Sequence, residues 1–136
     1  MSRQPLVLFV AMDGLTRRDI AAGLESYGHT VVTAGSGEEA LAIIGEQRNK
    51  ISVVVVDADM RGEVDGLAVA TAARAAHPKV TVIYTARLPH TIPVARQVSG
   101  APLVRTPYHP HQLAGVITML RHDARMPGLG AMEAAA

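Results

Sequence analysis

Continuous aliphatic runs alternate with segments of helical spacing along the chain. The runs are rich in valine and isoleucine and lack an apolar/polar alternation, which is the pattern of strands buried on both faces. Buried strands that alternate with helices predict a parallel sheet covered by helices on both sides. We expect the strands at residues 6–10, 29–33, 51–56, 80–84 and 102–105.

Capping residues and helix breakers mark the helices between these runs. Ser36 and Glu39 form a capping box that predicts the start of the second helix, and Pro110 is a typical first-turn residue for the fifth. The fourth predicted helix, near residues 91–98, contains Pro93 and has the weakest pattern. The others are expected at 16–27 and 67–76. The prediction is a (βα)5 α/β fold, a doubly wound five-stranded parallel sheet of flavodoxin-like topology.

Length and composition indicate one domain with an aliphatic core. Of the 136 residues, 49% are hydrophobic and only 3% are aromatic. We expect a folded domain over residues 1–122 and a disordered tail over 123–136, which is rich in Pro, Gly and Ala. A net charge of +1 and the scarcity of aromatic residues speak against nucleic-acid binding. The lack of cysteine favours a cytoplasmic protein, and no apolar run is long enough to span a membrane.

Residues capable of chemistry stand where the predicted strands end. In an open parallel sheet, functional groups gather at the carboxyl ends of the strands. Carboxylates follow the first and third predicted strands, and hydroxyl groups follow the fourth and fifth. The candidates are Asp13, Asp57, Asp59, Thr85, Thr106 and Tyr108.

Four segments at this spacing resemble the receiver (response regulator, CheY-like) domains of bacterial two-component signalling. The aliphatic run that ends at Asp57, with the loop that follows it to Gly66, is similar to the phospho-acceptor segment of that family. The other three segments are similar to the region around the second strand and to the ends of strands four and five. The four segments are residues 24–41, 53–66, 85–86 and 103–108, and the resemblance extends over about residues 5–120.

The resemblance implies a phosphoryl switch rather than an enzyme with a separate substrate. Asp57 would accept a phosphoryl group from a histidine kinase or phosphotransfer protein. Thr85 would donate its hydroxyl to a phosphoryl oxygen, and Tyr108 would follow Thr85 inward as a second switch residue. The Mg²⁺ of the family would be held by Asp57, the backbone carbonyl of Asp59 and an acidic residue after the first strand.

The resemblance also implies the kinds of partner. The chain has no recognisable DNA-binding or output segment, so a downstream protein would read the signal, with no nucleic acid and no membrane involved. The face formed by the fourth helix, fifth strand and fifth helix is a candidate homodimer surface.

Several positions depart from the family pattern. The acidic pair after the first strand falls on Ala11 and Met12, and Asp13 stands one position late, so that it could ligate a metal only if the loop shifted. The lysine of the fifth strand falls on Thr106, whereas Arg105 should point to the other face of the sheet. We therefore expect weak or absent Mg²⁺ binding and slow or absent phosphorylation by small donors. We also expect the bond before Pro107 to be cis.

Two alternatives remain open at this point. The missing acidic pair and lysine favour a pseudo-receiver, an interaction module that works without phosphorylation. A flavodoxin-like ligand-binding protein or small enzyme is the alternative from another class, because one fold hosts many chemistries.

Overall fold

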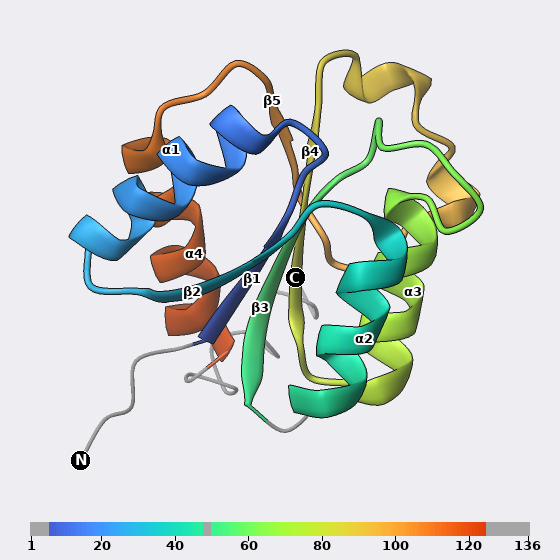
Figure 1. Ribbon diagram of the computed structural model, residues 1–136, viewed down its shortest axis with the longest axis horizontal. Helices are drawn as coiled ribbons and strands as arrows, with labels where there is room; N and C mark the ends of the chain where they lie inside the picture. Colours follow the sequence, from blue (N-terminus) through green and yellow to red (C-terminus); the bar gives the residue numbers. More distant parts are fainter. Residues whose placement is uncertain (1–5, 48–49, 125–136) are drawn as a thin grey trace, which may run out of the picture.

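The chain forms a parallel sheet between two helical layers (Figure 1). A computed structural model describes residues 6–47 and 50–124. The strand order β2-β1-β3-β4-β5, with every pair parallel, confirms the predicted five-stranded α/β fold. In chain order the elements are β1 (Leu6–Val10), α1 (Gly14–Ser26), β2 (Thr30–Ala34), α2 (Gly37–Gln47), β3 (Ile51–Asp57), α3 (Gly66–Ala76), β4 (Thr81–Ala86), the 3₁₀ turns η1 (Pro89–Thr91) and η2 (Val94–Arg96), β5 (Leu103–Arg105) and α4 (Pro110–Ala124).

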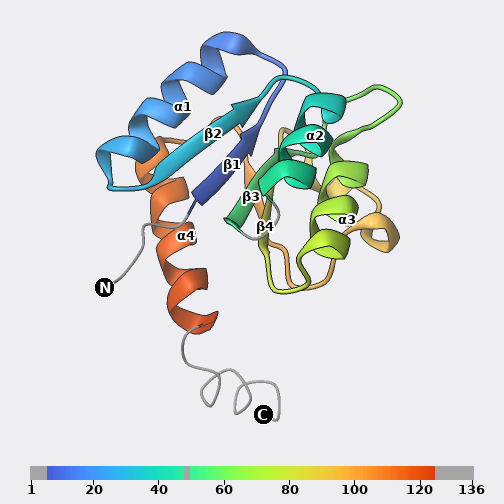
Figure 2. The ribbon, with the colours of Figure 1, turned by 60° about the horizontal axis from the view of Figure 1, so that its bottom comes forward.

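The sheet is buried on both faces. Helices α1 and α4 cover one face and α2 and α3 cover the other, as the two views show (Figures 1 and 2). Successive side chains of β3 enter the two cores in turn. Val53 and Val55 pack with residues of α1 and α4, whereas Val54 and Val56 pack with residues of α2 and α3. Because both faces of the strand need apolar side chains, the aliphatic run has no polar alternation.

Carboxylate and hydroxyl side chains cap three of the helices. Asp13 accepts a hydrogen bond from the Thr16 backbone N–H, so α1 begins at Gly14, two residues before the predicted start. Asp65 caps α3 in the same way. At α2, Ser36 accepts from the backbone N–H three residues on, as the capping box predicts.

The predicted fourth helix over residues 91–98 is wrong. Only the single 3₁₀ turns η1 and η2 form there, so the described chain contains four α-helices rather than five. Pro93 has no backbone N–H to donate, and the residue before a proline avoids the helical region. Ile92 is accordingly extended, with φ −85° and ψ 121°. The face expected to form a homodimer therefore lacks its helix.

Side chains from neighbouring elements hold this segment against α3 and β4. The Tyr84 hydroxyl accepts a hydrogen bond of 3.0 Å from the Val98 backbone N–H. Arg96 forms an ion pair of 3.1 Å with Asp65. These contacts fix a non-helical path at the carboxyl edge of the sheet.

The predicted fifth helix is confirmed as α4, which begins at Pro110 and packs beside α1. It continues to Ala124, so the first two residues of the predicted tail are helical and the rest lie outside the described residues. Within residues 6–47 and 50–124, no helix has the length and apolar character that crossing a membrane requires.

Candidate functional site

A cavity of about 670 Å³ lies at the carboxyl ends of the strands, on the side of α1 and α4. Its walls come from the loop after β1, the first turns of α1, and the segments that follow β3, β4 and β5. This is the edge at which parallel α/β sheets hold their functional groups. The cavity is lined by Ala11, Met12, Asp13, Thr16, Asp19, Ile20, Asp57, Asp59, Arg87, Thr106, Pro107 and Tyr108.

Asp57 is the last residue of β3 and lines this cavity. The alternation along the strand places it on the same face as Val55, towards α1 and α4. Its Oδ1 accepts a hydrogen bond of 2.9 Å from the Asp59 backbone N–H. Burial is the main cause that raises the pKa of Asp57, and the charge of Asp59 adds to it, whereas the hydrogen bond and Arg87 oppose the rise. The carboxylate is thus partly desolvated, as suits a nucleophile.

Thr85 stands beside Asp57 on the neighbouring strand. The two residues are register partners in the β3–β4 ladder. Thr85 is the one polar residue among those described as buried, with 4% of its surface exposed. It alternates with Ile83 and so shares the face of Asp57. The predicted pairing of a carboxylate at position 57 with a hydroxyl at position 85 matches the backbone register.

The loop after Asp57 is fixed by its own backbone. The Ala58 N–H donates to the Thr85 carbonyl at 2.8 Å, and the Met60 N–H donates to the Asp57 carbonyl at 3.1 Å. Gly66, the first residue of α3, packs so closely that a Cβ atom there would clash with the Asp57 carbonyl oxygen. A side chain at position 66 would therefore displace the acceptor strand.

Tyr108 and Thr106 line the same cavity as Asp57. The Thr106–Pro107 bond is cis, as expected. Tyr108 is half-buried, and its pKa is raised first by burial and then by the negative charge of Asp57. Tyr108 and Asp57 line the same cavity. Thr106 lines the cavity but brings no charge, and Arg105 is in register with Ala86, whose side chain packs in the core on the other face.

The side chains after β1 do not fit a magnesium site. Ala11 and Met12 have no oxygen ligand to offer. Asp13 lines the cavity, but one of its oxygens accepts from both the backbone N–H and the hydroxyl of Thr16, and these bonds keep the pKa of Asp13 below its usual value. In the described ranges, no three His, Cys, Asp or Glu side chains are grouped as a metal site requires. The structure thus gives the doubtful ligand Asp13 another role, as a helix cap.

Arg87 is a site residue that our sequence analysis missed. It follows β4 directly, two positions after Thr85, and lines the cavity with Asp57. Its backbone N–H donates to Oδ2 of Asp59 at 2.8 Å. Thr85 was predicted because functional groups gather at the carboxyl ends of parallel strands. The same reasoning, applied two residues further along the chain, would have included Arg87.

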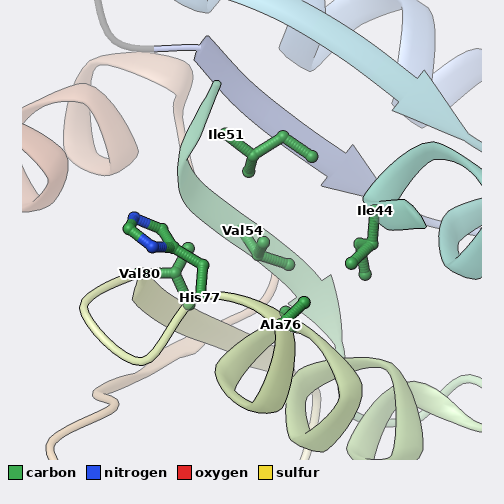
Figure 3. Close-up of a pocket in the computed structure, with 7 residues that line it drawn as sticks. Ile44, Ile51, Val54, Ala76, His77 and Val80 are labelled. Atoms are coloured by element: carbon green, nitrogen blue, oxygen red, sulfur yellow. The ribbon is translucent and has the colours of Figure 1, made fainter. Parts of the chain in front are cut away.

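A second, small cavity is unrelated to this site (Figure 3). It lies between α2, β3 and the end of α3, and apolar side chains such as Ile44, Ile51 and Val54 surround it (Figure 3). Its volume of about 10 Å³ is at the lower limit for one water molecule. It cannot hold a ligand.

The fold is that of receiver domains. No model of a known sequence family and no curated protein matches the chain. Among solved structures, the receiver domain of the hybrid histidine kinase CckA is similar over 84% of this chain and 96% of its own, with 25% identity and a TM-score of 0.72. A response regulator receiver domain from Clostridium thermocellum covers 90% and 98%, with 25% identity and a TM-score of 0.78. A receiver protein from Sinorhizobium medicae covers 90% and 98%, with 21% identity and a TM-score of 0.79.

Proposed function

We propose that this chain is a response regulator receiver domain that accepts a phosphoryl group at Asp57 and signals through protein–protein contacts. The observation that carries the proposal is the pairing of two groups at one strand edge. A partly desolvated carboxylate at the end of β3 faces an open cavity, and its register partner on β4 is the buried Thr85. A loop-capping aspartate would need neither the cavity nor the neighbouring hydroxyl.

The proposed step is a phosphoryl transfer between side chains. An Oδ atom of Asp57 attacks the phosphorus of a phosphohistidine on a kinase or phosphotransfer protein. The new O–P bond forms as the P–N bond breaks, and the imidazole nitrogen keeps the electron pair of that bond. Thr85 would donate its hydroxyl to one phosphoryl oxygen, and Tyr108 would respond from its place in the same cavity. Because the phosphoryl group originates in ATP, the proposed reaction belongs in the cytoplasm.

The output is proposed to be a change in a protein-binding surface. The Thr85 carbonyl accepts a hydrogen bond from the Ala58 N–H, and the Tyr84 hydroxyl accepts one from the Val98 N–H. Strand β4 therefore links the acceptor loop to the segment that contains η1 and η2. A new charge at Asp57 would bias this linked unit between two arrangements. Another protein would recognise the changed surface. Homodimer formation would have to use η2, β5 and α4, since the expected helix is absent.

The pseudo-receiver is the second candidate, and a specific observation favours it. Ala11, Met12 and Thr106 line the cavity at places where the receiver family has charged side chains. With less charge to stabilise a phosphoryl group, transfer would be slow. The flavodoxin-like alternative has no such support, because Asp13 occupies the start of α1, where the phosphate of a ligand would bind.

A labelling experiment separates the two candidates. The full chain is incubated with purified histidine kinases and radiolabelled ATP, and label that hydroxylamine removes is counted as acyl phosphate. The proposal expects such label on the wild type, none on Asp57→Asn, and wild-type label on Glu63→Gln, an exposed carboxylate in the same loop. No label with any kinase, together with equal kinase binding by wild type and Asp57→Asn, would establish the pseudo-receiver instead.

A further inference from the structure

The cavity around Asp57 has a surplus of negative charge. Carboxylates of Asp13, Asp19, Asp57 and Asp59 line it. A phosphoryl group would add roughly −1.5 to −2 charges at neutral pH. Transfer into such a cavity requires a nearby cation, because phosphoryl-transfer catalysis depends mainly on positioning and charge stabilisation. Among the residues described around the cavity, Arg87 is the one with a positively charged side chain.

We propose that Arg87 supplies the cation for the phosphoryl group on Asp57. It would replace the lysine of the receiver family, whose position Thr106 occupies in this chain. This inference rests on the proposed function. It assigns a specific residue to a task that the fifth strand cannot perform here.

The position of Arg87 suits this role. It follows the last residue of β4, and β4 is the strand hydrogen-bonded to β3, which ends at Asp57. Its backbone is anchored by the 2.8 Å hydrogen bond to the Asp59 carboxylate, so the side chain starts from a fixed point beside the acceptor loop. Arg87 and Asp57 line the same cavity, and the positive charge of Arg87 acts to lower the pKa of Asp57.

Three other arginines are engaged or face elsewhere. Arg17 donates to the carbonyls of Ala11 and Met12 at 2.8 and 3.0 Å, which holds the loop after β1 in place. Arg96 is paired with the Asp65 carboxylate, and Arg105 is directed to the other face of the sheet. Within the described residues, the Arg87 side chain forms no ion pair.

The chemistry of arginine fits the ligand. A guanidinium presents N–H donors in a planar fork that matches two phosphoryl oxygens, and it stays charged at any physiological pH. Arg87 is exposed, so its side chain is free to meet an incoming phosphoryl group. Solvent screening at an exposed site limits the effect to less than that of a buried donor.

The test compares phosphorylation rates of matched arginine variants. Arg87→Gln, Arg87→Lys and Arg105→Gln are incubated with phosphoramidate and, separately, with a kinase that labels the wild type. Arg87→Gln keeps the backbone hydrogen bond to Asp59 and should melt at the wild-type temperature. We expect it to be labelled about tenfold more slowly, a smaller loss than the 10²–10³ for a buried donor. Arg87→Lys should be intermediate and Arg105→Gln unchanged.

A rescue variant tests whether charge is the cause. Thr106 lines the same cavity, so adding Thr106→Lys to Arg87→Gln should restore most of the lost rate. Wild-type rates for Arg87→Gln, or a double variant as slow as Arg87→Gln, would overturn the role of Arg87 while the proposed function stood. If neither phosphoramidate nor any kinase labels the wild type at Asp57, the proposed function fails and this inference fails with it.

Discussion

Replacing Gly66 with alanine should displace the end of the acceptor strand β3. Gly66 opens α3 and packs against the end of β3. A Cβ atom at this position would clash with the Asp57 carbonyl oxygen and would lie 3.2 Å from Cα of Ala58. Both atoms belong to the backbone and cannot rotate away, so either α3 or the acceptor loop must move.

The cost follows from two opposing effects. Overpacking of this kind destabilises a protein by about 1–3 kcal/mol, and the rigid backbone contact places Gly66→Ala near the upper value. The loss of chain entropy in the unfolded state offsets about 0.4–1 kcal/mol. The net loss in the free energy of unfolding is then about 2 kcal/mol, which corresponds to a fall in Tm of roughly 6–10 °C for a domain of this size.

Thermal melts with a matched control measure this effect. Gly45 lies in α2 with nothing within 4 Å of an added Cβ. Gly45→Ala should therefore raise the stability by about 0.5–1 kcal/mol through helix propensity. The reasoning is refuted if Gly66→Ala melts at or above the wild-type temperature, because the close packing of α3 on the acceptor strand would then be absent.

Three further predictions concern single hydrogen bonds and charges. Asp65→Asn should lower the free energy of unfolding by roughly 0.5–1 kcal/mol at neutral pH. Because Arg96 holds the pKa of Asp65 below 3.8, this stabilisation is present above that pH and lost below it, so denaturant melts of the two proteins should converge in acid. Tyr84→Phe should cost about 1–2 kcal/mol and speed hydrogen exchange at the Val98 amide, and unchanged exchange would contradict the contact. In a spectroscopic pH titration, Tyr108 should ionise above the usual 10.0, and Asp57→Asn should lower its pKa, since the Asp57 charge helps to raise it.

Most of the fold could be predicted from hydrophobic pattern alone. Strands buried on both faces leave uninterrupted aliphatic runs, and capping residues such as Ser36 mark the helix starts. The segment around Pro93 could not be predicted in this way. Its path depends on contacts from distant residues, the Tyr84 hydroxyl and the Asp65 carboxylate, which local sequence does not reveal.

The candidate site was predictable in part. Asp57, Thr85, Thr106 and Tyr108 were found because parallel strands bring their carboxyl ends to one edge. The cap at Asp13 was overlooked, since a residue next to a strand end is also next to a helix start. The positive charge in the cavity comes from Arg87, which follows β4. Strand register does not predict where the end of so long a side chain lies.

The measurement that tests the central claim most directly is chemical trapping of the phosphorylated residue. Borohydride reduces an aspartyl phosphate to homoserine, and peptide mass spectrometry then locates the changed residue. After incubation of the full chain with a phosphorylated kinase, we predict homoserine at position 57 and unmodified aspartate at positions 13, 19 and 59. Homoserine at one of those other positions, or at none while the kinase loses its phosphoryl group to the chain, would contradict the assignment of Asp57 as the acceptor.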